Sequence, residues 1–446
     1  MSMRRTTIVL ALAVLLAAVT WMTGARGSNA NAVAVRPTVF DAAELPVDDV
    51  SRIELARNDQ ATLVFERSDD GAWLQTAPIE HPMDPYSMRQ IAVMAREVRV
   101  SDALAAADLG ESLSLASLGL QPPQATLSMT SPAGTSTVEL GRRGVAGRAF
   151  VRRDDEVLVV SPELHARVLE MDPREWRDRQ LFSNAGVEAV AIELHQGDYT
   201  LRLERSGRAW SLVKPVVTRL DAEGRDDLFK TLAGAHSQGF IADDPADLAP
   251  FGLDAPPAWV EIVSRPAGAA VETIERLLIG VPIGGSPDWY AMVEGRSTVF
   301  RMEGNTLARM FNSDALVDPT GSGVRPADVK SMTVRTESDD FTIERDLDRW
   351  IAPARGGREV PADVADQLLR GLTEVRAQAV NVAEFPRDAS IGLVILRDFS
   401  GRAIDTIRVA RAPEPDGRWI LENGDNVLRL FPASTQLPLT AAAFGL

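Results

Sequence analysis

The stretch Leu203-Glu204-Arg205-Ser206-Gly207-Arg208-Ala209-Trp210 decides the architecture, because a similar phrase occurs three times in the chain. The first copy is Phe65-Glu66-Arg67 followed by Trp73, and the third is Ile343-Glu344-Arg345 followed by Trp350. The three Trp residues lie roughly 140 positions apart, which is the size of a small domain. The chain is therefore predicted to contain three tandem copies of one module.

Each copy of the phrase has the period of a β-hairpin. Leu201 and Leu203 alternate with polar residues, which is the pattern of a strand with one buried face. Ser206-Gly207 and its counterpart Asp69-Asp70-Gly71 are typical turn residues, because they tolerate the positive φ of a tight reversal. The Trp then lies on the return strand, where we expect it to fill the seam between the hairpin and a helix.

A helix and four more strands are predicted after each hairpin. The helices begin after Asp84, after Asp221 and at Pro361, and each continues with apolar residues at helical spacing. The last two strands of each copy form a hairpin, predicted at Ala149–Arg152 with Val157–Val160, Trp289–Val293 with Thr298–Met302, and Trp419–Glu422 with Val427–Phe431. The module order β-β-β-α-β-β-β-β indicates an α+β fold, in which each module is a mostly antiparallel sheet of hairpins with one covering helix.

The repeat also sets the predicted domain bounds. They are an N-terminal signal-anchor or transmembrane segment at 1–27, a tether at 28–45, and repeat modules at 46–183, 184–318 and 319–446. A length of 446 residues agrees with about three domains. Asp318-Pro319-Thr320-Gly321-Ser322-Gly323, between the second and third modules, has the composition of a short flexible linker.

A loop with a central glycine opens the second half of the modules. Leu118-Gly119-Leu120 and Phe251-Gly252-Leu253 are each followed by Pro-Pro. The third copy has Ile391-Gly392-Leu393 without the prolines, so we expect the third module to depart from the pattern of the other two.

The N-terminus carries an export signal. Arg4 and Arg5 precede an apolar run from Ile8 to Met22, whose length lies between that of a signal-peptide core and a full membrane span. This length favours an uncleaved anchor over a cleaved secreted form, for which Ala30-Asn31-Ala32 offers a cleavage site. In either case the basic flank stays inside and the bulk of the chain is exported.

Composition excludes several classes of function. A net charge of −16 repels phosphate backbones, so we expect no nucleic-acid partner. The chain has no Cys, which excludes disulfides, thiol catalysis and a lipid-modified N-terminal Cys. Four single histidines and a glycine-containing loop without a following helix predict neither a metal site nor a phosphate-binding cofactor site. These residues are His81, His165, His195 and His236, and Gly141, Gly144 and Gly147.

Three carboxylates and six tryptophans are the candidate site residues. Each module has one Glu of the repeated phrase, whereas a glycosidase needs two carboxyl groups in one cleft, so we expect an ion pair or a solubilising charge and no catalytic role. A second set of tryptophans is a candidate interaction surface, provided that at least one ring is exposed in a groove. The structural residues of the repeat are Trp73, Trp210, Trp350, Glu66, Glu204 and Glu344, and the candidate interaction surface is Trp259, Trp289 and Trp419.

With these motifs and the segment Trp176-Arg177-Asp178-Arg179, the chain from about residue 45 to its C-terminus resembles the bacterial family catalogued as domain of unknown function 4340. The resemblance implies a single N-terminal membrane segment and an exported, β-rich repeat region on the periplasmic side of a bacterial inner membrane. Genes of this family often lie beside those of ABC-transporter permeases, which implies an accessory role at such a complex. The family offers no catalytic residues to transfer.

Two functions are therefore expected. The first is a non-enzymatic, membrane-anchored scaffold or accessory subunit of an ABC-transporter-type assembly in the envelope. The second is an exported module that binds glycan or peptide in an aromatic groove. No catalytic constellation and no cofactor are expected in either case.

Overall fold

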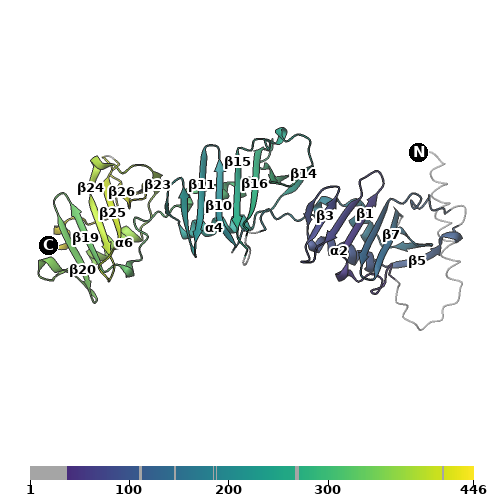
Figure 1. Ribbon diagram of the computed structural model, residues 1–446, viewed down its shortest axis with the longest axis horizontal. Coiled ribbons are helices and arrows are strands. Elements are labelled where there is room, and N and C mark those ends of the chain that lie inside the picture. The colour runs from purple at the N-terminus through teal and green to yellow at the C-terminus, as the bar shows by residue number, and fades with distance from the viewer. Residues whose placement is uncertain are drawn as a thin grey trace, which may run out of the picture. The chain divides into compact units, whose positions relative to one another are not determined.

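The fold consists of three nine-stranded antiparallel sheets, each accompanied by helices (Figure 1). This computed structural model describes residues 38–109, 113–144, 147–183, 185–186, 188–266, 271–413 and 416–446. The strand orders are β4-β3-β2-β1-β6-β7-β8-β9-β5, β13-β12-β11-β10-β15-β16-β17-β18-β14 and β22-β21-β20-β19-β24-β25-β26-β27-β23. The three orders are the same, so the three repeats predicted from the Trp residues share one sheet topology.

The first sheet carries one long helix between two strands that lie at opposite edges. Its strands are β1 (Arg52–Arg57), β2 (Leu63–Arg67), β3 (Trp73–Ala77), β4 (His81–Met83), β5 (Val100–Ala105), β6 (Ala125–Ser131), β7 (Gly134–Arg143), β8 (Ala149–Arg153) and β9 (Glu156–Val160). Helix α2 (Pro85–Glu97) joins β4 to β5, and the short α3 (Glu163–His165) follows β9. Met88, Ile91 and Ala95 form the buried face of α2, at the helical spacing that the sequence shows.

The second sheet repeats this arrangement, again with a helix after the second strand of its final hairpin. Its strands are β10 (Ala189–Gln196), β11 (Tyr199–Ser206), β12 (Ala209–Lys214), β13 (Thr218–Arg219), β14 (Gly239–Asp243), β15 (Ala258–Ser264), β16 (Thr273–Pro282), β17 (Trp289–Val293) and β18 (Thr298–Met302). Its helices are α4 (Ala222–Ala233) and α5 (Gly304–Met310). The Asp221 side chain caps α4 by accepting hydrogen bonds from the N–H groups of Glu223 and Gly224.

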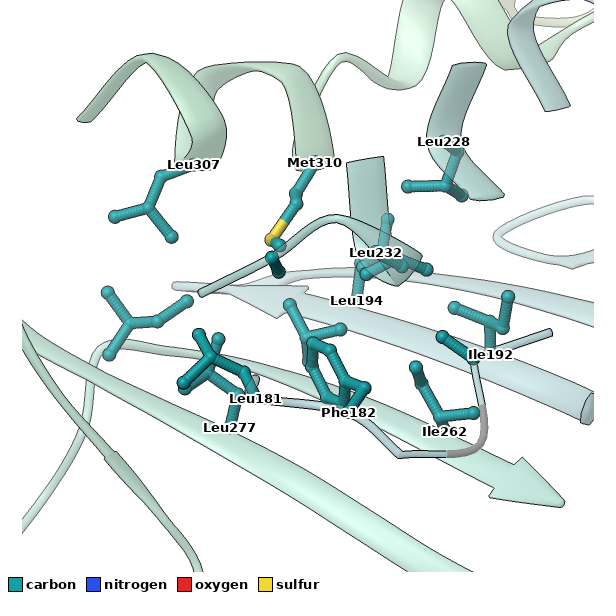
Figure 2. Close-up of a cluster of buried hydrophobic side chains, with 14 of the residues drawn as sticks. Leu181, Phe182, Ile192, Leu194, Leu228, Leu232, Ile262, Leu277, Leu307 and Met310 are labelled. Atoms are coloured by element: carbon teal, nitrogen blue, oxygen red, sulfur yellow. The ribbon is translucent and has the colours of Figure 1, made fainter. Parts of the chain in front are cut away.

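The core of the second module lies between these helices and the sheet. Figure 2 shows Leu228 and Leu232 of α4 and Met310 of α5 on the helix side of the cluster, with Ile192 and Leu277 on the strands. Packing of this amphipathic face supplies most of the stability of such short helices.

The third sheet repeats the arrangement with a single helix. Its strands are β19 (Ser331–Thr336), β20 (Asp340–Asp346), β21 (Arg349–Ala352), β22 (Arg358–Val360), β23 (Ala379–Val382), β24 (Ser390–Arg397), β25 (Ala403–Arg411), β26 (Trp419–Glu422) and β27 (Val427–Phe431). Helix α6 (Ala362–Thr373) buries Leu368, Leu369 and Leu372.

The register between the first two strands of each sheet is the same in all three modules. Phe65 lies opposite Ile53, and the corresponding pairs are Leu203 with Ile192 and Ile343 with Met332. All six side chains are buried, so the predicted alternation is confirmed. The final hairpins also form as predicted, with Ala149 opposite Val160, Trp289 opposite Met302 and Trp419 opposite Phe431.

The predicted strand count was incomplete, because each sheet has two further strands that flank the long helix. In the first sheet these are β4 and β5. β4 has three residues, one of which is Pro82, and β5 is an edge strand with five exposed residues in its six. β4 is too short, and β5 too exposed, for a period of two to mark either strand in the sequence.

The glycine loops explain why the third module differs. Gly119 and Gly252 have φ of 70° and 66°, and a Cβ on Gly141 or Gly280 of the neighbouring strand would lie 2.5 or 1.9 Å from the carbonyl oxygen of Leu118 or Phe251. Glycine is therefore required at two positions: in the loop, where φ is positive, and on the neighbouring strand, where the loop carbonyl approaches closely. In the third copy Gly392 lies inside β24 and pairs with Thr336, so this module departs from the pattern at this place, as the sequence predicts.

The chain divides into two compact units. One contains the described residues of Met1–Pro78 together with Pro85–Pro173, and the other contains Ile79–Asp84 together with Arg174–Leu446. Each sheet falls within one of the predicted modules, whose bounds stay a prediction.

The described end of the predicted tether is packed against the first module. Val39, Phe40 and Leu45 are buried, and Glu44 pairs with Arg153 at 2.6 Å. The predicted membrane segment at 1–27 lies outside the described residues. Within the described residues, no helix combines the length and the apolar composition that crossing a membrane requires.

Candidate functional site

The Trp residues of the repeated hairpin lie against the long helices. Trp210 contacts Phe229 of α4 edge-on, with ring centroids 5.0 Å apart. Trp350 is buried and donates its indole N–H to Asp366 of α6 at 3.0 Å. Trp73 is buried as well. The Arg of the phrase pairs with the Trp across the hairpin, as at Arg67–Trp73, Arg205–Trp210 and Arg345–Trp350.

We expect Trp350→Phe to lower the free energy of unfolding by about 1 kcal/mol more than Trp210→Phe does. Both changes remove the same part of a ring, but only the first leaves a carboxylate, that of Asp366, without its indole donor. Urea denaturation of the two variants beside the wild type measures the difference. Equal losses would show that the hydrogen bond contributes nothing to stability.

The Glu residues of the phrase each lie in an ion pair. Glu66 pairs with Arg52 on the neighbouring strand, Glu204 with Arg202 at 2.7 Å, and Glu344 with Lys330 at 3.1 Å. All three carboxylates are half exposed and lie in different sheets. Pairs this exposed contribute little to stability.

The three tryptophans of the candidate interaction surface are packed to different degrees. Trp259 stacks on His195, with ring centroids 5.1 Å apart, and lies 5.0 Å from the guanidinium carbon of Arg276. Trp289 is partly buried against the core of the second module. Trp419 is only 9% exposed, and its indole N–H has no hydrogen-bond partner among the described residues. Trp259 and Trp289 are therefore partly exposed, whereas Trp419 is buried.

An open concavity of about 720 Å³ lies instead on the third module. Phe399, at the tip of the β24–β25 turn, is 66% exposed there. Arg325 and Arg402 line the same hollow and pair with Asp328 and Asp398 at 2.8 and 3.5 Å. An apolar ring between charged groups suits a ligand with both a flat face and polar edges. Phe399 could not be recognised from the sequence, because a single aromatic residue in a turn shows no periodic pattern.

A metal site is not formed by the described residues, which contain no group of three or more His, Asp or Glu that could hold an ion. The four histidines lie in different parts of the chain: His81 on β4, His165 on α3, His195 on β10, and His236 between α4 and β14.

The most extensive group of buried charges joins the second sheet to the third. Arg429 of β27 is fully buried and donates to the carbonyl of Asp318 at 2.8 Å. It also donates to Asp425 at 2.8 Å and to the hydroxyl of Thr218 at 3.2 Å, and that hydroxyl donates to Asp425 at 2.5 Å. We call Arg429, Asp425, Thr218 and Asp318 the Arg429 cluster.

Two further ion pairs surround the Arg429 cluster. Arg219 of β13 binds the carboxylate of Asp318 at 2.8 Å, and Arg376 pairs with Asp221 at the start of α4. Burial opposes ionisation of Asp425, but hydrogen bonds from Arg429 and Thr218 outweigh it and hold the pKa of that carboxyl below its usual range. Burial likewise opposes ionisation of Asp318, and hydrogen bonds from Thr320 and Arg219 lower its pKa. Both carboxylates are charged at neutral pH.

The segment predicted to be a flexible linker, 318–323, is held in place by this cluster. Ser322 is fully buried and donates to Asp405 at 2.5 Å. A Cβ on Gly321 would lie 2.9 Å from the carbonyl oxygen of Leu372, and one on Gly323 would lie 2.6 Å from Arg219. The prediction of flexibility was wrong because these glycines are needed for close approach.

The connection before the second sheet is built in the same way. Asp84 donates its N–H to the carbonyl of Trp176 at 2.9 Å, as Asp221 does to that of Leu316 at 2.9 Å. Two residues further along, the N–H groups of Asp178 and Asp318 donate to the carbonyls of Pro82 and Arg219 at 3.0 and 3.1 Å. We call these the first and second connections.

Side chains anchor both connections. In the first, Leu181 and Phe182 enter the core of the second module (Figure 2). The buried Arg177 binds both carboxylate oxygens of Asp243, at 2.7 and 2.9 Å. Sequence reasoning missed both connections, because their partners are distant along the chain.

Comparisons with known proteins identify a family for this chain. No curated protein matches the chain. A crystal structure from Eubacterium rectale ATCC 33656, described as a candidate DNA polymerase III beta subunit, is 6% identical and covers 86% of this chain and 91% of its own, with a TM-score of 0.14. At that TM-score the likeness supports no statement about fold or function.

A family profile matches residues 73–211 and 210–391, which together span most of the chain. The two matches begin at Trp73 and Trp210, the tryptophans of the repeated hairpin. This agrees with the family that the sequence motifs indicate. The chain therefore belongs to the family described as Domain of unknown function (DUF4340).

Proposed function

We propose that this protein is a non-enzymatic, membrane-anchored scaffold or accessory subunit of an ABC-transporter-type assembly, with its sheets on the periplasmic side of a bacterial inner membrane. The Arg429 cluster carries the proposal, because it joins the second and third sheets through buried, charged hydrogen bonds. Such bonds are geometrically demanding, so they favour one fixed arrangement of the elements they join. A scaffold needs that property to hold partners at set positions.

The proposal of a membrane anchor is supported by the basic residues Arg4 and Arg5 and the apolar run from Ile8 to Met22. The partner class rests on the family, whose genes often lie beside those of transporter permeases. The net charge of −16 suits a protein that stays soluble outside its points of contact.

Crosslinking in membranes of the native host tests the proposal. We expect a short amine- or carboxyl-reactive crosslinker to join exposed residues of the second and third modules to a permease subunit, and mass spectrometry to identify the linked peptides. A Glu204→Gln variant should give the same crosslinks, because that carboxylate has only a structural ion pair. Recovery of the chain without any transporter subunit would overturn the proposal.

A variant in which a cleavable signal peptide replaces residues 1–27 tests the anchor proposal separately from the scaffold proposal. If the anchor serves only to localise the protein, the soluble form should still crosslink to the permease, at reduced yield. Extraction of the unaltered chain from membranes by alkaline carbonate would contradict the anchor alone.

A second candidate function is glycan or peptide binding, and the Phe399 concavity is the observation that favours it. A ring this exposed can stack on a sugar face. Retention on peptidoglycan sacculi that is lost in Phe399→Ala would support this reading, whereas equal retention of both proteins would count against it.

A further inference from the structure

His81 is buried in the first connection. It lies on β4, within the segment Ile79–Asp84, which we call the strap, and its side chain is 3% exposed. The ring contacts Phe240 of β14 edge-on, with centroids 5.3 Å apart. Nδ1 lies 2.8 Å from the carbonyl oxygen of Pro82, so this nitrogen carries the proton of the neutral ring.

Charged groups from several elements surround His81, whereas β18 contributes the uncharged Thr298 and Phe300. Arg177 lies over the same Phe240 ring at 5.1 Å and is paired with Asp243 on β14. Arg296, from the β17–β18 turn, lines a small cavity with His81.

The cavity also contains polar groups of the first connection. Asp178 and Arg179 line it, as does the hydroxyl of Ser237, which is buried and has no hydrogen-bond partner among the described residues. A protonated imidazole at this position would add a further positive charge next to two guanidinium groups.

These surroundings keep the ring neutral. Burial lowers the pKa of His81 from 6.5 to about 4, and the charges of Arg177 and Arg296 add to this effect, whereas the Pro82 carbonyl and Asp243 oppose it. Burial also lowers the pKa of Arg296.

The second connection has no such group at the matching place. Thr218 on β13 precedes Asp221 by three residues, as His81 precedes Asp84, and its hydroxyl does not titrate. The two connections therefore share backbone hydrogen bonds but differ in one ionisable side chain.

We propose that the strap is an acid-released latch: protonation of His81 detaches Ile79–Asp84 from the second sheet, while the second connection stays closed. This inference does not rest on the proposed function.

The direction in which pH changes the docking of the strap follows from proton binding. The released strap exposes an imidazole that binds a proton near pH 6.5, whereas the docked strap binds one only near pH 4. Docking is therefore fully favoured above about pH 6.5 and weakens about tenfold for each pH unit as the pH falls toward 4.

Hydrogen exchange of the purified full chain measures the latch directly. The amides of Asp84 and Asp178 report on the first connection, and those of Asp221 and Asp318 report on the second. Between pH 7.5 and 4.5 we expect protection factors, corrected for intrinsic exchange, to fall on the order of a hundredfold in the first pair only.

His81→Thr places in the strap the residue that the second connection has at this position. This variant should keep its protection at pH 4.5, while the acid response around the buried His165 of α3 stays as in the wild type. The same acid release in His81→Thr as in the wild type would assign it to the carboxylates and overturn the proposal. If the variant does not fold, the wild-type comparison still decides, because equal behaviour of the two connections also overturns the proposal.

Discussion

Arg429→Ala is expected to lower the free energy of unfolding by about 3–5 kcal/mol, the cost of breaking a buried ion pair by removing one partner. The variant leaves the carboxylate of Asp425 with the hydroxyl of Thr218 and the N–H of Val427 but no cation, and the carbonyl of Asp318 loses its donor. A charge left buried without its partner is destabilising, because the interior cannot solvate it as water does. Guanidinium denaturation, followed by tryptophan fluorescence, measures the loss.

Arg402→Ala is the matched control for Arg429→Ala. Arg402 also pairs with an aspartate, Asp398, but its side chain is 79% exposed. We expect this control to change stability by less than about 0.5 kcal/mol. A loss below about 1 kcal/mol for Arg429→Ala would show that the cluster does not join the two sheets firmly, which would also weaken the scaffold proposal.

Gly280→Ala is expected to lower the free energy of unfolding by about 3 kcal/mol, the upper end of the cost of overpacking a close contact. The new Cβ would lie 1.9 Å from the carbonyl oxygen of Phe251, which belongs to backbone and cannot rotate away. The loop before β15 must then move off β16. Thermal denaturation, with exchange at the Gly252 loop as the local readout, measures both effects.

Gly284→Ala serves as the control for Gly280→Ala. It makes the same substitution four residues further on, where an added Cβ meets nothing within 4 Å. This change should be neutral or slightly stabilising, because alanine restricts the unfolded chain. A loss in Gly280→Ala no larger than in the control would contradict the packing role of this glycine.

The third module lacks one part of the connections. Where the first two modules have Asp84 and Asp221, whose N–H groups bind the following segment, the third has Pro361 before α6. Proline has no N–H, so the third sheet cannot make that hydrogen bond. The departure of the third copy that the sequence predicts is thus a change at two places, the glycine loop and this cap.

Local sequence patterns were sufficient to predict the repeated hairpin, the starts of the long helices and the final hairpins. Alternation around Leu203 marks its strand, and Asp221 marks the start of α4 as a cap. These features depend on neighbours within a few residues, so they can be read without the tertiary structure. The family likewise followed from motifs of this kind.

The tertiary structure alone decided the short edge strands and the connections. Arg429 and Thr218 are 211 positions apart, and Arg177 and Asp243 are 66 apart, so no local pattern links them. Composition even misled at Gly321 and Gly323, where glycine serves close packing and not mobility. The sequence by itself determined three repeats of a β-rich module. How the modules of the second compact unit are joined, and which charges are buried there, depended on contacts that form only when distant segments fold together.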